Sequence, residues 1–396
     1  MKKVIISIFL ILFCTGSVWS LDFEETKKLA ELGDSKSQYF LGLMYNAGEG
    51  VPQDYNKSVY WYTKSAEQGF PEAQGMLGLM YHKGKGVTQD YKKAVYWYTQ
   101  SAEQGFPGAQ GMLGSMYYKG EGVPQDYKKS VYWYTKSAEQ GNSKEQYNLG
   151  IKYSNGKGVP QDYKKSVYWY TKSAEQGHSK SQYFLGLMYS NGKGVTQDYK
   201  KSVYWHTKSA EQGNSQSQYN LGLMYSNGKG VTQDYNKSVY WHTKSAEQGH
   251  SKSQYNLGLM YFNGKGVPQN YKKAVYWYTK SAEQGNFSAQ SNLGNMYDSG
   301  KGLPQNYKKA VFWYTKSAEQ GNSSAQYNLG IMYFDGKGVP QNYKIAYVWE
   351  NLAASQGHKN AVNNRDIIAE KLTPQQLGEA QELASKIQYK IDNPTK

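Results

Sequence analysis

The feature that most constrains this chain is a 36-residue period that covers about four fifths of it. Glycines from Gly69 to Gly357 and tyrosines from Tyr45 to Tyr333 keep this step without any insertion. One tryptophan marks each period: Trp61, Trp97, Trp133, Trp169, Trp205, Trp241, Trp277, Trp313 and Trp349. Nine units of 36 residues make 324, which fill positions 34–357 of the 396-residue chain. An internal repeat overrides the expectation from length of about two or three ordinary domains, so the chain is predicted to be one array of stacked copies.

The first part of each copy has the pattern of an amphipathic helix. In the first copy, the residues spaced i, i+3, i+4 and i+7 form one stripe: Gln38, Leu41, Gly42 and Tyr45. Glycine inside a helix costs up to about 1 kcal/mol relative to alanine. A glycine kept there in all nine copies indicates a second helix that lies very close.

The second part of each copy predicts a loop and another helix. Gly48, Gly50 and Pro52 are expected to end the first helix, and Asp54 has the short acceptor that an N-cap needs. The last three copies carry Asn270, Asn306 and Asn342 at this position, which keeps the cap. The helix over 55–68 places Ser58, Trp61, Tyr62, Ser65 and Ala66 on one side and Lys57, Tyr60, Lys64 and Glu67 on the other. Gly69 stands where a left-handed C-terminal cap is expected.

These patterns predict an all-α fold, a right-handed superhelical α-solenoid of stacked antiparallel hairpins. A lone hairpin could not bury its seam, so the copies must stack. We expect a signal peptide at 1–20, an N-terminal capping segment at 21–33, nine repeats at 34–357, and closing helices with a tail at 358–396.

The N-terminus predicts export. Lys2 and Lys3 precede an apolar run from Val4 to Phe13, which is too short to span a membrane, and the cleavage site is expected after Ser20. Cys14 is the chain's one cysteine and follows a bulky residue, which disfavours lipid attachment. Cleavage would leave a mature chain without disulfides, in the periplasm or outside the cell.

The chain carries 46 basic and 31 acidic side chains, a formal charge of +15. This excess favours acidic partners or solubility, and export argues against nucleic acid as a partner. A row of basic residues in the first turn of the second helix, at Lys57, Lys92, Lys93, Lys128 and Lys129, is a candidate contact for an anionic surface, or else a solvated edge. The helix dipole disfavours cations at this end.

The pattern LGLMYxxGxGV followed by DYxKSVYWYxKSAEQG resembles the Sel1-like repeat, a relative of the tetratricopeptide repeat. The segment from Ala369 to Gln388 resembles the polar closing helices that follow such arrays in bacterial proteins. The resemblance implies an interaction scaffold that assembles protein complexes or engages the cell envelope or a host cell. Some cysteine-rich relatives are associated with β-lactam binding or hydrolysis, but the mature chain has none of their cysteines.

The exposed face of the first helix is the predicted partner-binding groove. It lies roughly 130° from the buried stripe and differs between copies. The candidate residues on it are Tyr39, Tyr147, Tyr183, Tyr219, Tyr255, Tyr327, Lys36, Lys144, Lys180 and Lys252. Gly75 and Gly111 replace the tyrosine in two copies and predict a shallow pocket there. The alternative is that these tyrosines pack against the first helix of the next repeat. A protein or peptide partner fits the tyrosine row, and an anionic envelope glycan is the alternative.

The sequence offers little for catalysis or metal binding. His206 and His242 replace Tyr62 one repeat apart without further ligands at suitable spacing, so they are expected to be substitutions in the seam. Acidic residues recur as caps and solvated positions, which argues against a catalytic carboxylate pair. We therefore predict a binding protein without a cofactor and not an enzyme.

Overall fold

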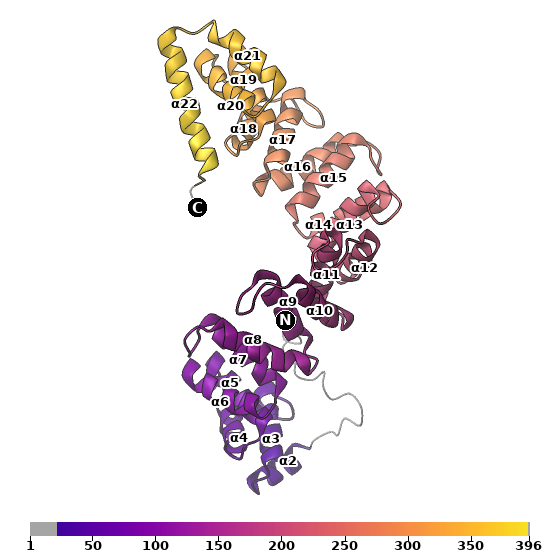
Figure 1. Cartoon of the computed structure of the whole chain (residues 1–396), viewed down its shortest axis with the longest axis vertical. Coiled ribbons are helices and arrows are strands. Elements are labelled where there is room, and N and C mark those ends of the chain that lie inside the picture. The colour runs from indigo at the N-terminus through magenta and orange to yellow at the C-terminus, as the bar shows by residue number, and fades with distance from the viewer. Residues whose placement is uncertain (1–21, 395–396) are drawn as a thin grey trace. The chain divides into compact units, whose positions relative to one another are not determined.

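The computed structural model describes residues 22–394, and within this range every regular element is an α-helix. The all-α solenoid of stacked hairpins predicted from the sequence is confirmed. Figure 1 shows the helices following one another in chain order. The predicted signal peptide and its cleavage site after Ser20 lie outside the described residues.

Each of the nine repeats forms one helical hairpin. The first helix of the hairpins, helix A, is α3 Ser35–Ala47, α5 Pro71–Lys83, α7 Pro107–Lys119, α9 Ser143–Asn155, α11 Ser179–Asn191, α13 Ser215–Asn227, α15 Ser251–Asn263, α17 Phe287–Ser299 and α19 Ser323–Asp335. The second helix, helix B, is α4 Tyr55–Glu67, α6 Tyr91–Glu103, α8 Tyr127–Glu139, α10 Tyr163–Glu175, α12 Tyr199–Glu211, α14 Tyr235–Glu247, α16 Tyr271–Glu283, α18 Tyr307–Ala318 and α20 Tyr343–Ser355. Three further helices flank the array: α2 Phe23–Glu31, α21 Lys359–Ala369 and α22 Pro374–Asp392.

The close approach of the two helices explains the glycine inside helix A. A Cβ atom added at Gly42 would lie 2.5 Å from Cδ1 of Tyr62, which is fully buried. The hydroxyl of Ser58 donates to the carbonyl oxygen of Gly42 at 2.8 Å, and Ser65 donates to the carbonyl of Ser35 at 2.6 Å. The small residues of helix B therefore let the helices touch and also satisfy carbonyl groups of helix A.

A glutamine of helix A links neighbouring hairpins. The side chain of Gln74 donates to the carbonyl of Ala66 in the previous hairpin at 3.1 Å. It also accepts from Gln104 of its own hairpin at 2.8 Å. The N-terminal helix α2 takes the place of a helix B in this scheme, because Gln38 donates to the carbonyl of Ala30 at 3.0 Å.

The predicted caps are confirmed. Gly48 adopts φ +75° at the end of α3, and Gly69 adopts φ +86° after α4, conformations that suit glycine. The Asp54 carboxylate accepts from the backbone N–H of Lys57 at 3.0 Å, and Asn270 accepts from Lys273 at 2.9 Å.

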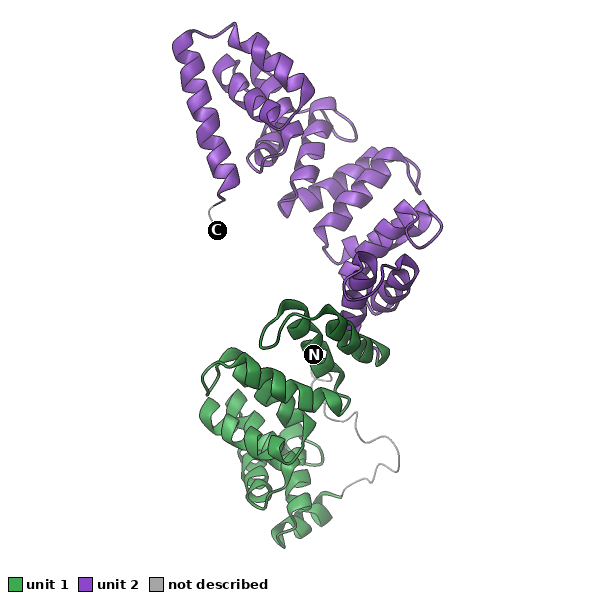
Figure 2. Cartoon of the chain, in the orientation of Figure 1, with its two compact units in different colours: residues 1–176 green, residues 177–396 purple. Residues whose placement is uncertain are grey.

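The chain divides into two compact units, residues 1–176 and 177–396 (Figure 2). The second unit contains the closing helices of the predicted segment 358–396. Thr373 begins α22 with a capping box to Gln376. Ala380 and Ala384 of α22 are buried in one cluster with Val348 and Leu352 of α20.

Candidate functional site

The six tyrosines of the predicted groove are half-buried, and their rings pack on the seam residue of their own helix B, on the residue before the next helix A, or on both. The ring of Tyr39 lies 6.0 Å from Tyr62 and 5.3 Å from Phe70, which precedes the next helix A. Tyr219 lies 4.9 Å from His250, and Tyr327 stacks on His358 at 4.4 Å, in the same way. The remaining three lie 5.8–6.1 Å from the seam residue of helix B: Tyr147 by Tyr170, Tyr183 by His206, and Tyr255 by Tyr278. Each ring thus has one packed side and a remaining accessible part.

Charge along this row comes from lysine. Lys36, Lys144, Lys180 and Lys252 are all exposed. Burial raises the pKa of Tyr39 to about 12 and also raises the pKa of Tyr147, Tyr183, Tyr219 and Tyr255. The hydroxyls of these five tyrosines therefore stay protonated at neutral pH, and their neutral rings lie beside exposed ammonium groups.

The pocket expected at Gly75 and Gly111 is wrong, because larger side chains fill both places. A Cβ atom at Gly75 would lie 3.1 Å from Cε1 of Phe106, and one at Gly111 would lie 2.7 Å from Oε1 of Glu145. Glu145 is itself buried and accepts from Asn148 at 2.6 Å, and burial raises the pKa of its carboxyl. The space left by each missing tyrosine is thus filled by a side chain of the following repeat.

Lys152 is a candidate functional residue that no sequence pattern above predicted. This buried lysine of α9 stands where most repeats have methionine. Its Nζ lies 3.2 Å from the ring centroid of Tyr118 and 5.9 Å from that of Tyr134. Burial lowers the pKa of Lys152 to about 8, while the ring faces attract its charged form. Its departure from the repeat consensus was the available signal.

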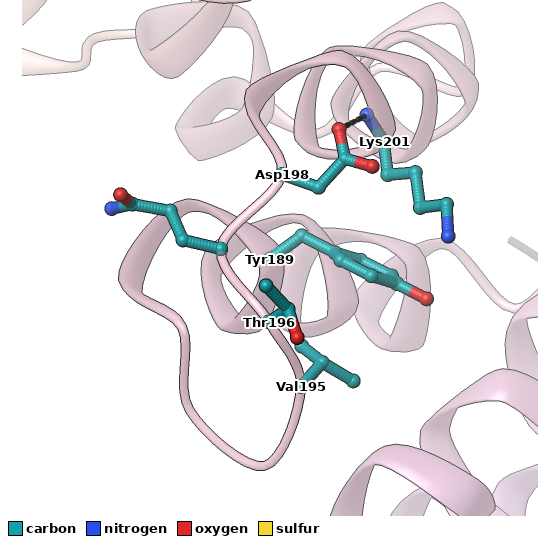
Figure 3. A pocket seen from close by; sticks show the side chains of 6 residues that line it. Tyr189, Val195, Thr196, Asp198 and Lys201 are labelled. Carbon is teal, nitrogen blue, oxygen red and sulfur yellow. Dashed lines mark hydrogen bonds between the residues drawn. The ribbon is translucent and has the colours of Figure 1, made fainter.

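The start of helix B forms a lysine edge with a small pocket. In the fifth repeat, a cavity of about 260 Å³ is lined by Tyr189, Val195, Thr196, Gln197, Asp198 and Lys201. Figure 3 shows the Lys201 side chain running along the Tyr189 ring, with its Nζ 5.4 Å from the ring centroid. The backbone N–H of Lys201 donates to Asp198 at 2.9 Å. The pocket thus offers an ammonium group, an aromatic ring and polar groups on a short loop.

The lysine edge recurs through both units. Its first set of contacts places a lysine of helix B over the helix A tyrosine that is equivalent to Tyr45. The distances are 5.1–5.5 Å, and the lysines are Lys57, Lys93, Lys129, Lys165, Lys201, Lys237, Lys273 and Lys309. A second set places the loop lysine of one repeat over the first tyrosine of the preceding helix B, as with Lys229 and Tyr199 at 5.6 Å. Of the predicted basic row, Lys57, Lys93 and Lys129 belong to the first set, whereas Lys92 and Lys128 belong to neither.

The outer side of helix B carries an exposed aromatic row. We call this side the outer B face and define it by the positions of Lys57, Tyr60 and Lys64 in each repeat. The aromatic residue of this face is 52–57% exposed in eight repeats. These residues are Tyr60, Tyr96, Tyr132, Tyr168, Tyr204, Tyr240, Tyr276 and Phe312. Each ring meets the following tryptophan edge-on at 4.9–5.0 Å. The sequence placed Tyr60 on the solvent side but did not identify a site, although the repeated exposed ring was a visible signal.

The two repeat histidines occupy the seam as expected. His206 and His242 are both 1% exposed and lie opposite Gly186 and Gly222. Burial lowers the pKa of both to about 4. Among residues 22–394, no three metal-ligating side chains gather, and no helix has the length and apolar character needed to cross a bilayer.

The comparisons with known proteins agree with this geometry. The model of the Sel1 repeat matches nine segments: 35–70, 71–106, 107–142, 146–178, 179–214, 215–250, 251–286, 287–322 and 323–358. A protective antigen of uropathogenic Escherichia coli with an SLR fold is 39% identical, with a TM-score of 0.67 over 92% of this chain and 87% of that one. A Sel1 repeat protein from Oxalobacter formigenes is 37% identical, with a TM-score of 0.61 over 78% of this chain and 90% of that one. No curated protein matches significantly.

Sel1 repeat proteins are generally scaffolds for protein–protein interaction. The matched segments cover the hairpin array except for residues 143–145, and eight of the nine begin at the first residue of a helix A. The chain belongs to the Sel1 repeat family.

Proposed function

We propose that this chain is an exported scaffold that binds a protein or peptide along the groove row of its A helices. The supporting observation is the contrast between the constant hydrogen-bonded seam and the variable groove row beside it. The half-buried rings are held by packing, and exposed lysines flank them at Lys36, Lys144, Lys180 and Lys252. Rigid aromatic groups bind with little loss of conformational entropy, so such a row suits an extended partner.

The test compares two variants of the mature chain as baits in extracts of envelopes and host cells. The groove variant carries Lys144→Glu, Lys180→Glu and Lys252→Glu, because the tyrosines also contribute to packing. A control variant carries Lys136→Glu, Lys172→Glu and Lys244→Glu on the outer B face. A partner that is lost by the groove variant and kept by the control supports the proposal. If both variants keep every partner at unchanged helicity, the groove is not the binding surface.

A second candidate function is binding of an anionic envelope glycan at the lysine edge. The favouring observation is the pocket of Figure 3, where Lys201 lies beside an aromatic ring that can stack on a sugar. Its attraction should weaken with salt, because screening acts over about 8 Å at physiological ionic strength. Sedimentation with isolated peptidoglycan tests it. Binding that is unchanged by Lys201→Gln, Lys237→Gln and Lys273→Gln together would exclude this edge.

Export is the remaining part of the proposal. It predicts that the mature protein begins at Leu21 and is recovered from the periplasm or the medium. N-terminal sequencing of the fractionated protein tests this, and an intact Met1 in the cytoplasmic fraction would contradict it. The family's general role argues against an enzyme, and hydrolysis of a chromogenic β-lactam by the purified chain would reverse that interpretation.

A further inference from the structure

The outer B face in the second unit is chemically uniform until the last repeat. The helices α12, α14, α16 and α18 expose one aromatic residue each: Tyr204, Tyr240, Tyr276 and Phe312. The lysine one turn later lies 5.6–5.9 Å from each ring centroid, at Lys208, Lys244, Lys280 and Lys316. The same arrangement occupies α4, α8 and α10 of the first unit.

The last repeat shows what can cover this face. In α20 the three defining positions hold Ile345, Val348 and Leu352, and Val348 is fully buried. Helix α21 follows α20 as a helix A follows helix B in the other repeats, so the additional covering element is α22. A Cβ atom at Gly321 would lie 3.0 Å from Cγ2 of Ile391, so α22 extends from α20 to the end of the eighth hairpin. An amphipathic helix therefore lies on the outer B face within this molecule.

A polar contact orients that helix, and the lysine that makes it has counterparts in three other B helices of the second unit. The Nζ atom of Lys344, the second residue of α20, lies 3.0 Å from Oε2 of Glu379 in α22. The same position of α12, α16 and α18 is an exposed lysine: Lys200, Lys272 and Lys308. A second helix laid along these elements would meet the same cation in the same place.

The difference between the covered and open faces indicates the partner's chemistry. A permanently covered face is apolar, whereas reversible interfaces combine aromatic groups with charge. In α12 the basic residues Lys200, Lys201 and Lys208 outnumber Glu211, which leaves 3 − 1 = +2 for the helix. A partner with leucines opposite these lysines would leave them unpaired, and one with carboxylates would complement them.

We propose that the outer B face of α12, α14, α16 and α18 docks an acidic amphipathic helix of a partner protein, in the manner in which α22 lies on α20. The surface is distinct from the groove of the proposed function. The aromatic rings supply the contact area, and the lysines determine the sign of charge and the orientation of the bound helix. The same chemistry on the first unit offers a second, separate surface of this kind.

The experiment uses synthetic peptides based on residues 374–392. That segment has three acidic and two basic side chains, so 2 − 3 = −1. The acidic probe carries Lys386→Glu and Lys390→Glu, which gives 0 − 5 = −5. The basic probe carries Glu379→Lys and Glu382→Lys, which gives 4 − 1 = +3. Fluorescence anisotropy measures binding of each probe to the mature chain. We expect the acidic probe to bind at least about tenfold more tightly than the basic one, and more weakly as salt is added.

Two variants locate the binding. An aromatic variant carries Tyr204→Ala, Tyr240→Ala and Tyr276→Ala, and a charge variant carries Lys208→Gln, Lys244→Gln and Lys280→Gln, which copies the natural Gln100 of the second repeat. Each variant should weaken binding of the acidic probe about tenfold or more, whereas the groove variant should not. This test is therefore independent of whether the groove binds a partner. The proposal is overturned if the acidic probe does not bind or binds both variants as tightly as the unmodified chain. Polygalacturonate serves as a control polyanion. If it binds the unmodified chain as tightly as the acidic probe does, and the two variants weaken its binding equally, the face binds polyanions in general and the proposal is also overturned.

Discussion

The seventh and ninth hairpins place different residues on the outer B face of the same backbone plan. Helix α16 carries Lys273, Tyr276 and Lys280 there, and α20 carries Ile345, Val348 and Leu352. Tyr276 is 54% exposed, whereas Val348 is fully buried under the closing helix. The comparison shows that the repeat pattern determines the seam between helices A and B. The residues of the outer B face depend instead on whether solvent or a further helix covers them.

A second difference lies in the seam itself. The residue opposite the helix A glycine is tyrosine in six repeats, histidine in the fifth and sixth, and Glu350 in the ninth. A Cβ atom at Gly330 would lie 2.7 Å from Cγ of Glu350, as close as the tyrosines come elsewhere. The close helix contact thus tolerates ionisable groups, which should make stability depend on pH in different directions along the array.

The largest effect is expected from a charge placed under the closing helix. Val348→Asp should destabilise the ninth hairpin by about 3–5 kcal/mol, because it leaves an unpaired carboxylate in a fully buried position. Hydrogen exchange of α19–α22 is the measurement, since repeat arrays need not unfold in one step. The matched control Tyr276→Asp should change exchange of α15–α16 by less than about 1 kcal/mol. Equal losses at the two positions would contradict the covered-versus-open comparison.

The next effect concerns Glu350. Burial raises the pKa of this carboxyl from 4.5 to about 8, and Asn364 donates to its Oε1 at 3.0 Å. Because the unfolded carboxyl releases its proton first, the stability of the ninth hairpin should fall as pH rises from 4.5 to 8. At 1.36 kcal/mol per pKa unit the loss reaches at most about 4–5 kcal/mol. Glu350→Gln should remove this dependence, with a gain near pH 8 and little change at pH 4.

Hydrogen exchange of α19–α21 across this pH range measures the Glu350 effect, with α15–α16 as the internal reference. A variant that follows the unmodified chain at every pH would show that Glu350 is ionised and compensated in the folded state. The Gln side chain keeps the size and the contact with Asn364, so a packing change does not explain a difference confined to high pH.

The opposite pH dependence is expected from the two histidines. Burial lowers the pKa of His206 and His242 from 6.5 to about 4. The unfolded imidazoles bind protons first as pH falls, so stability is complete above pH 6.5 and is lost between 6.5 and 4, by up to about 3 kcal/mol per histidine. Exchange of α11–α14 should rise in acid, and His206→Tyr with His242→Tyr should abolish the rise, as Tyr278 fills the same place elsewhere. Persistence of the acid sensitivity in the double variant would locate its origin outside the seam.

The fold was largely predictable because its determinants repeat locally. The stripe of Gln38 and Leu41, the cap at Asp54 and the glycine at 42 each have a fixed spacing within one copy, and nine copies reinforce every pattern. Contacts between copies were harder to predict, because the spacing of residues within one copy does not show which side chains of the next copy lie near it. The sequence did not show that Phe106 and Glu145 fill the places above Gly75 and Gly111. It also placed Tyr60 in solvent without indicating a partner, since exposure alone does not identify one.

The smallest effect separates binding from stability. Lys280 lies 5.9 Å from the Tyr276 ring centroid at an exposed position, where a cation–π contact contributes about 0.5–1 kcal/mol at most. Lys280→Gln should change exchange of α15–α16 by less than about 0.5 kcal/mol, since the second repeat carries Gln100 beside Tyr96 on the same backbone plan. If Lys280→Gln instead destabilises α16 by more than about 1 kcal/mol, the lysine at this position stabilises its own helix. Its recurrence in the repeats is then explained without a binding partner. If α16 stays stable in Lys280→Gln but the variant binds the acidic probe less tightly, the recurrent lysine serves partner binding.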